Sequence, residues 1–278
     1  MANEITVKPV DRLKAILNVE SIQTQFRNAL KENAPSFISS IVELFSSDTY
    51  LQQCDPNAVI MEAFKAATLK LPINKQLGFA YIVPYKKNGV QAPQFQIGYK
   101  GYIQLAMRTG QYRYINADAI KEGMATKRDI LTGQIDFSGE PASDKTIGYF
   151  AYIELLNGFS KALYVTKDEV IAHAQKYSKS YKNEGSAWHS NFDEMAIKTA
   201  LRRLLSHYGI LSTEMLSALT NDSDLSEEET VEREIANHAN SETIDITPNS
   251  PPEADNRAKP EPGVSEGLFT QPAAEPGF

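Results

Sequence analysis

Apolar residues in the first quarter of the chain are spaced as in helices. Over residues 10–70 they recur every three or four positions, and short polar clusters separate the runs. Asp55 followed by Pro56 has the residue types preferred at the N-cap and at the first position of a helix. We therefore predict helices throughout this part, the last of them over residues 57–71 and ended by Pro72.

The pattern changes to that of strands further along the chain. Runs rich in aromatic and β-branched residues follow one another, separated by residues that favour turns. Asn157-Gly158 lies between the last two runs, and both residues tolerate a positive φ, which predicts a tight hairpin. Between the second and third runs, residues 100–110 fit about two and a half turns of helix. The predicted strands cover residues 79–85, 94–98, 112–121, 147–155 and 161–166.

Helical spacing returns after the last predicted strand. Thr166 and Glu169 have the spacing of a capping box, which predicts a helix start. A further helix is predicted over residues 191–208, and its apolar stripe comprises Ile197, Ala200, Leu201, Leu204, Leu205 and Tyr208. The predicted fold class is therefore α+β, with N-terminal helices, a central antiparallel β-rich core, and helices that are inserted into the core and follow it.

The C-terminal part of the chain has a different composition. Residues 219–278 hold 3 Lys and Arg against 14 Asp and Glu, a balance of −11, whereas residues 1–218 hold 25 against 21, a balance of +4. Proline is frequent after residue 221, and large apolar residues are few. Such a segment cannot offset the entropy lost on folding. We predict a folded domain over residues 1–220 and a disordered, acidic, proline-rich tail over residues 221–278.

Motifs of the common enzyme classes are missing from the sequence. It has no P-loop, no zinc-protease or serine-hydrolase motif, and no dinucleotide-binding fingerprint. The four histidines show no metal-site spacing, and Cys54, as the single cysteine, excludes an internal disulfide and a cysteine-based zinc site. No catalytic or metal site is expected, although a nuclease with acids far apart in sequence remains an alternative. Without an apolar run of about 18 residues or a secretory signal, the expected location is the cytoplasm.

The main candidate for a binding surface is a basic segment without acids. The 55 residues between Glu62 and Asp118 contain eight Lys or Arg residues and no carboxylate. A surface without carboxylates suits a polyanion, because each neutralised phosphate releases counterions and nearby rings can stack on bases. The segment centres on residues 94–115, "QFQIGYKGYIQLAMRTGQYRYI". We therefore interpret it as a candidate nucleic-acid surface.

The helix predicted within this segment has a charged face. Lys100 and Arg108 are eight residues apart and lie on one side of it. Gly98 and Gly101 bracket the turn before it, where backbone N–H groups are able to meet a phosphate; a purely structural role in the turn is the alternative. Gly98 to Gly101 also match the G-x-x-G loop of KH domains, a weak similarity. The tyrosines of this region are either base platforms or packing residues.

A second basic cluster precedes and enters the last predicted helix. Lys198 and Arg202 are four residues apart, and Arg203 follows. Glu194 has the spacing to pair with Lys198 on the surface, whereas the two arginines have no acid four residues away in either direction. Trp188, the only tryptophan, either anchors this helix to the core or contacts a base.

These segments resemble the RecT family of phage-encoded single-strand annealing proteins. The similarity rests on "QFQIGYKGYIQLAMRTGQYRYI" and "WHSNFDEMAIKTALRRLLSHYGI", with "LPINKQLGFAYIVPYK" before the first; it runs over residues 10–220 and keeps the segment order. The resemblance implies an ATP-independent recombinase in a bacterial host. Such a protein coats single-stranded DNA as a ring or helical filament and anneals it to a complementary strand. It also implies a fold similar to that of the λ Red beta annealing protein.

The resemblance also implies site residues and partners. The DNA contacts expected on it are Lys100, Arg108, Arg113, Lys198, Arg202 and Arg203, with Tyr99, Tyr102 and Trp188 as candidate ring contacts. Residues 10–50 are expected to contact neighbouring subunits. No cofactor is required, and Mg²⁺ is left open as an aid to annealing.

The acidic tail has more than one interpretation. It is expected to bind a phage exonuclease or the host single-strand-binding protein, or to compete with DNA for the basic surface; a tail that only confers solubility is the alternative. For the whole protein, the alternative to annealing is a KH-like module that binds RNA or single-stranded DNA.

Overall fold

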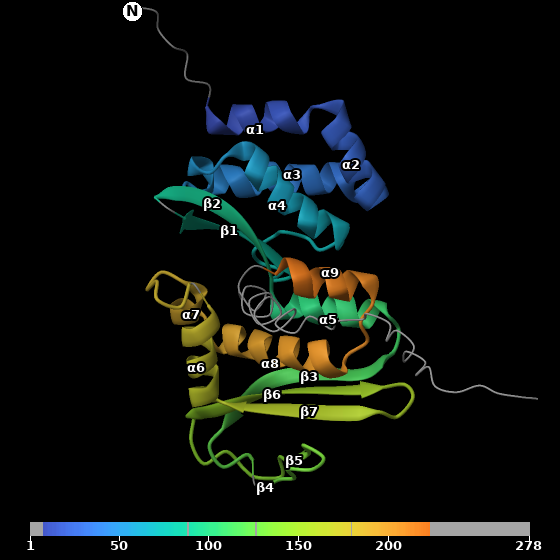
Figure 1. Ribbon diagram of the computed structural model, residues 1–278, viewed down its shortest axis with the longest axis vertical. Coiled ribbons are helices and arrows are strands. Elements are labelled where there is room, and N and C mark those ends of the chain that lie inside the picture. Colours follow the sequence, from blue (N-terminus) through green and yellow to red (C-terminus); the bar gives the residue numbers. More distant parts are fainter. Residues whose placement is uncertain (1–7, 88, 126, 179, 223–278) are drawn as a thin grey trace, which may run out of the picture.

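The N-terminal helices pack into a bundle (Figure 1). Apolar side chains that repeat at helical spacing form its core. Phe26, Ile41 and Phe45 are buried there, and burial of a side chain of this size stabilises the fold by about 1.5–3 kcal/mol. The computed structural model describes residues 8–87, 89–125, 127–178 and 180–222. The bundle comprises α1 (Pro9–Leu17), α2 (Glu20–Leu30), η1 (Lys31–Asn33), α3 (Ala34–Ser47), η2 (Leu51–Gln53) and α4 (Pro56–Thr68).

Helix α4 begins as predicted but ends earlier. Asp55 is its N-cap, and its carboxylate accepts an N–H of the first turn at 3.2 Å. The helix ends at Thr68, because Lys70 adopts a φ of 53° and the Leu71 N–H turns back to a carbonyl of the last turn at 3.0 Å. This hydrogen-bond pattern is a Schellman motif. The prediction that Pro72 ends the helix is therefore wrong.

The predicted strands form two antiparallel sheets, and a short third pair of strands accompanies them. The strands are β1 (Ala80–Lys87), β2 (Val90–Ile97), β3 (Tyr112–Lys121), β4 (Lys127–Arg128), β5 (Ile135–Asp136), β6 (Thr146–Leu155) and β7 (Ser160–Thr166). β1 and β2 form a hairpin, and the larger sheet has the order β3-β6-β7. Gly158 has a φ of 87° between β6 and β7, which confirms the hairpin predicted at Asn157-Gly158. The pair β4–β5 was not predicted, because two-residue strands leave no periodicity to detect.

The remaining helices are stacked on one side of the larger sheet (Figure 1). They are α5 (Tyr99–Arg108), α6 (Lys167–Tyr177), α7 (Ala187–Ser190), α8 (Phe192–Tyr208) and α9 (Thr213–Asn221). The predicted capping box at the start of α6 is confirmed: Thr166 Oγ1 accepts the Glu169 N–H, and the Glu169 carboxylate accepts the Thr166 N–H. α8 crosses the sheet, and α5 and α9 lie on the other side of α8 (Figure 1). The predicted apolar stripe of α8 is buried apart from Tyr208, which is 44% exposed.

The predicted α+β class is confirmed, and the first two residues of the predicted tail are part of the described structure. The predicted tail over residues 221–278 lies outside the described residues, except for its first two. Asn221 ends α9, which the sequence pattern did not predict, and Asp222 is only 3% exposed. Asp222 therefore belongs to the body, although its acidic neighbourhood in sequence assigned it to the tail.

Two glycines allow the loop before β1 to contact the start of α5. A Cβ on Gly98 would lie 2.1 Å from the Gly78 carbonyl oxygen, and one on Gly101 would lie 2.2 Å from the Phe79 carbonyl oxygen. Real Cβ atoms do not approach backbone this closely, so neither position tolerates a side chain. Packing therefore accounts for both glycines, which form the first turn of α5 directly after β2.

Gly98→Ala is expected to lower the free energy of unfolding by about 1–3 kcal/mol, because backbone must move to admit the methyl group. Gly185→Ala is the matched control, since a Cβ there meets only the Asn183 Oδ1 atom, at 3.6 Å. Urea unfolding of both variants measures the difference. Equal stabilities would mean that the loop before β1 moves away at no cost.

Candidate nucleic-acid interface

A groove lies between two parts of the molecule. The β1–β2 hairpin and the start of α5 form one side, and α7 and the start of α8 form the other. Two adjoining hollows of about 380 and 140 Å³ make up the groove, and they share Tyr81, Tyr99, Asn191 and Glu194. We call it the hairpin groove. Its other lining residues are Lys75, Gln76, Gly78 and Lys100 in the larger hollow and Val83, Gln96, Ile97, Gly98, Ala187, Met195 and Lys198 in the smaller one.

Two tyrosines and a lysine converge on one wall of the hairpin groove. A Cβ on Gly78 would lie 3.2 Å from the Tyr81 hydroxyl and 3.4 Å from Lys100 Cδ, so these two side chains meet over Gly78. Lys100 Nζ lies 5.8 Å from the centre of the Tyr99 ring, within cation–π range. Burial, reinforced by the carboxylate of Glu194, raises the pKa of Tyr81, so its hydroxyl is neutral near pH 7. The wall offers two half-buried rings and one ammonium group.

A buried ion pair lies against the smaller hollow. Lys198 Nζ is 3.0 Å from Asp222 Oδ2, with the two side chains 5% and 1% exposed. The carboxylate also accepts the Tyr102 hydroxyl at 2.7 Å and the Ile97 N–H at 3.3 Å. Burial, and then the charge of Asp222, raises the pKa of Tyr102 well above its usual value, so the hydroxyl stays protonated and donates. Lys198 therefore pairs with Asp222, not with Glu194 as the sequence spacing indicated.

Two rings that were candidates for base contacts lie in the core. Tyr102 is 0% and Trp188 2% exposed. Trp188 Nε1 donates to Ser178 Oγ at 2.8 Å, and its ring meets Phe192 edge-on with centroids 5.9 Å apart. Neither ring presents a face to solvent, so both are packing residues in this structure. Lys198 likewise lies in the interior and is not a surface cation.

Arg108 joins α5 to the end of α4. Its Nη1 donates to the Leu69 carbonyl at 2.7 Å and its Nη2 to the Lys70 carbonyl at 2.8 Å. The last carbonyls of a helix lack intrahelical partners and carry partial negative charge, so a guanidinium there caps α4. The sequence placed Arg108 on the same face as Lys100. In the structure, however, its guanidinium donates to two backbone carbonyls of the protein itself.

Arg108→Gln is expected to lower the free energy of unfolding by about 1–2 kcal/mol, because charge-assisted hydrogen bonds to α4 are lost. The slope of log affinity for single-stranded DNA against log salt concentration is expected to stay unchanged. Titrations at several salt concentrations, beside urea unfolding, measure both quantities. A slope reduced by about one would instead identify Arg108 as a phosphate contact.

Acids from distant segments neutralise part of the acid-free segment over residues 63–117. Arg113 pairs with Glu154 of β6, and Lys75 pairs with Asp48 beyond the end of α3, both at 2.9 Å. The two cations are about half exposed, so each pair stabilises the fold by no more than about 1 kcal/mol. In the folded protein, carboxylates from other segments therefore neutralise two of the positive charges of a segment that itself contains no acid.

Arg202 and Arg203 lie on another side of α8, outside the hairpin groove. Arg202 is half-buried, and its Nη2 donates to the Leu219 carbonyl of α9 at 3.1 Å. Arg203 is exposed, and both arginines line a hollow between α6 and α8. Of the predicted site residues, only Tyr99, Lys100 and Lys198 border the hairpin groove, so the prediction does not define one continuous surface.

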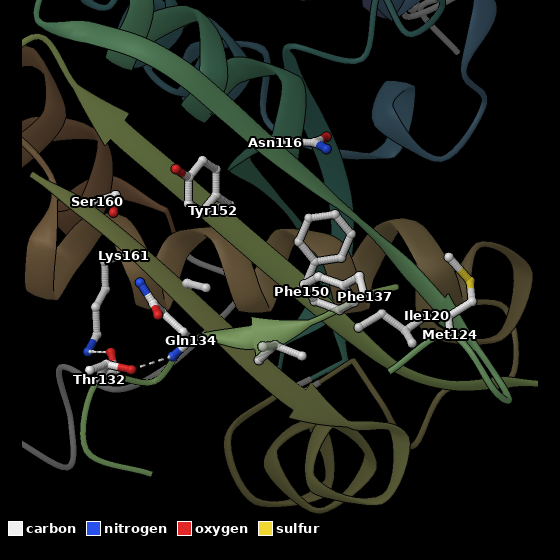
Figure 2. A pocket seen from close by; sticks show the side chains of 12 residues that line it. Asn116, Ile120, Met124, Thr132, Gln134, Phe137, Phe150, Tyr152, Ser160 and Lys161 are labelled. Atoms are coloured by element: carbon white, nitrogen blue, oxygen red, sulfur yellow. Dashed lines mark hydrogen bonds between the residues drawn. The ribbon is translucent and has the colours of Figure 1, made fainter. Parts of the chain in front are cut away.

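A further hollow, of about 590 Å³, lies between the β4–β5 segment and the face of the large sheet away from α8 (Figure 2). Its lining is mainly apolar, and the rings of Phe137 and Phe150 within it are 5.2 Å apart. The ammonium of Lys161 reaches its rim, where it donates to the Thr132 carbonyl at 2.7 Å. Such a lining suits packing or an apolar ligand better than a phosphate backbone.

Several residues of the hairpin groove were not predicted from the sequence. Tyr81 belongs to a predicted strand in which aromatic residues alternate. The sequence alone does not show whether such a ring packs in the core or lines a groove, and the structure places it in the groove. Asn191 and Gln96 are polar residues without a motif. Asp222, which pairs with the groove residue Lys198, was assigned to the tail because acidic residues follow it in sequence. No pattern in the sequence could have identified Asn191 or Gln96.

Among the residues that the structure describes, no group of three or more His, Cys, Asp or Glu side chains could hold a metal ion. Within the same residues, no helix has both the length and the apolar character needed to cross a membrane.

An α+β body with a groove that presents tyrosine rings beside a lysine has the features of a single-strand nucleic-acid binder. The comparisons with known proteins agree with this class. Residues 35–240 match the RecT family, and the chain therefore belongs to it. Membership supports DNA binding and a role in single-strand annealing and recombination. Proteins of this family are generally not catalytic enzymes.

Two relatives are similar over long stretches. An uncharacterised protein, YqaK, of Bacillus subtilis (strain 168) is 45% identical over 258 residues, which cover 92% of this chain and 86% of the relative. Protein RecT of Escherichia coli (strain K12) is 29% identical over 178 residues, which cover 62% of this chain and 65% of the relative.

Proposed function

We propose that the protein binds single-stranded DNA in the hairpin groove and anneals it to a complementary strand without ATP. The observation that carries the proposal is the wall of Tyr81, Tyr99 and Lys100, in a chain that belongs to the RecT family. A base stacked on an aromatic side chain contributes about 1–3 kcal/mol, and this contribution depends little on sequence. An annealing protein needs such contacts, because it must bind single strands of any base sequence.

Annealing proceeds without a fuel molecule, since each base-pair step returns about 1.4 kcal/mol of stacking. The protein has to neutralise phosphates and keep bases accessible. On this proposal Lys100 contacts the backbone beside the groove. The exposed Arg203 contacts it elsewhere, as does Arg113, which is about half exposed and paired with Glu154. No cofactor is needed, and Mg²⁺ would act by screening the two strands from each other.

The finer features of the proposal concern assembly and partners. The protein would coat DNA as a ring or filament, with residues 10–50 contacting the neighbouring subunit. The acidic composition after residue 222 supports a tail that binds a phage exonuclease or the host single-strand-binding protein. Electron microscopy with and without single-stranded DNA tests the assembly, and particles of single subunits in both samples would contradict it.

The annealing proposal is tested by mixing complementary oligonucleotides, one labelled with a donor and one with an acceptor dye, without nucleotide. Faster duplex formation than in protein-free controls is expected. Binding of single strands without any acceleration would exclude annealing and favour a simple binding module. Cleavage of the strands that a metal chelator abolishes would instead indicate a nuclease.

A further inference from the structure

The facing sides of α6 and α8 enclose a hollow with an unusual lining. Its volume is about 380 Å³, and it shares no lining residue with the hairpin groove. We call it the α6–α8 pocket. It is lined by His173 and Tyr177 of α6 and by Thr199, Arg202, Arg203, Ser206 and His207 of α8.

The chemistry of this lining matches a phosphate group. The guanidinium of Arg203, two imidazoles and three hydroxyls are gathered there, and none of the seven lining side chains is a carboxylate. Phosphate oxygens only accept hydrogen bonds, and the planar guanidinium of arginine donates to two of them at once. A lining with many donors and no acid selects an anion and disfavours a cation or an apolar ligand.

Arg203 is the residue most available to such a ligand. Its side chain is exposed, and it forms no ion pair with any carboxylate of the described residues. Arg202 is half-buried beside it and directs one N–H to the Leu219 carbonyl, so its guanidinium is held in place. One arginine is therefore fixed and the other is able to close on a ligand.

His207 is oriented by its own helix. Its Nδ1 lies 2.8 Å from the Arg203 carbonyl, and because a carbonyl oxygen only accepts, Nδ1 must donate. This leaves Nε2 as the ring atom for another partner. His173 is held on the opposite wall, with its ring 4.8 Å from that of Tyr177. The polar groups are thus held in place by both helices.

We propose that the α6–α8 pocket binds a phosphate group. The nucleic-acid source rests on the proposed function, which this site would extend beyond the hairpin groove. The phosphate itself has three sources: an internal phosphodiester, a terminal 5′-phosphate, or free inorganic phosphate. All three sources present phosphate oxygens that accept hydrogen bonds. Because the three differ in charge and in accessibility, an experiment can distinguish them.

The test compares Arg203→Gln and His207→Gln with the full-length wild type and with Lys145→Gln, a control that changes an exposed lysine just before β6. Three ligands are titrated: a single-stranded oligonucleotide with a 5′-hydroxyl, the same oligonucleotide with a 5′-phosphate, and inorganic phosphate. Circular dichroism checks that each variant is folded. Two pocket variants are used so that the test can still be made if one of them does not fold.

Each outcome has a defined meaning. Equal loss of affinity for both oligonucleotides in Arg203→Gln, with a salt slope reduced by about one, identifies an internal phosphodiester. Loss of a wild-type preference for the 5′-phosphate identifies a terminal phosphate, and loss of inorganic phosphate binding alone identifies the free ion. If neither pocket variant differs from Lys145→Gln with any ligand, the proposal is overturned. Inorganic phosphate tests the pocket even if annealing fails, so the two proposals fail separately.

Discussion

Replacing Asp222 by alanine is expected to lower the free energy of unfolding by about 3–5 kcal/mol, because it removes one partner of a buried ion pair. Lys198, a residue only 4% exposed, loses the carboxylate that lies 3.0 Å from its Nζ atom, and the Tyr102 hydroxyl and the Ile97 N–H lose their acceptor. Urea unfolding followed by the fluorescence of buried Trp188 measures the change.

Glu20→Ala is the control for this prediction, because Glu20 pairs with Arg27 at 2.9 Å where both side chains are exposed. Its expected cost is below about 1 kcal/mol. The double variant Lys198→Met with Asp222→Leu is expected to be more stable than Asp222→Ala, since no unpaired charge stays buried. Equal, small losses in Asp222→Ala and Glu20→Ala would mean that water reaches Lys198 and that the pair is not structural.

The double variant Tyr99→Leu with Lys100→Gln is expected to bind single-stranded DNA at least about tenfold more weakly, because one lost base stack costs about 1–3 kcal/mol. Leucine keeps much of the bulk of Tyr99, which packs partly against the core. Loss of the Lys100 charge is expected to reduce the salt slope by about one. Fluorescence anisotropy at several salt concentrations measures both effects.

A matched pair of residues elsewhere provides the control for the groove. Lys161 Nζ lies 5.2 Å from the centre of the Tyr208 ring, a contact similar to that of Lys100 with Tyr99. Neither residue borders the hairpin groove. Tyr208→Leu with Lys161→Gln is expected to leave affinity nearly unchanged. If the two double variants weaken binding equally, the groove has no special role.

Much of the fold follows from local pattern. The strands around Asn157-Gly158, the capping box at Thr166 and the N-cap at Asp55 were predicted and are present. Each depends on residues close in sequence, through preferred dihedral angles or short hydrogen bonds. The end of α4 was predicted wrongly, because Lys70 adopts a left-handed conformation that its residue type does not favour.

The candidate site was harder to predict, because its residues come together through packing. Charge spacing along a helix says which residues share a face, but not which element that face meets. Arg108 meets the end of α4, Arg113 meets Glu154 and Lys198 meets Asp222. Each of these partners lies more than twenty residues away in sequence.

The sequence alone determined the α+β class, the order of helices and strands, and the separation of a weakly basic body from an acidic tail. It also determined the resemblance to the RecT family, because ordered motifs need no coordinates. Only the tertiary structure decided which rings are buried and which cations are paired: Tyr102 and Trp188 lie in the core, whereas Tyr99 and Lys100 border a groove. The reason is physical, since burial and ion pairing depend on distances between segments remote in sequence, which no local pattern contains.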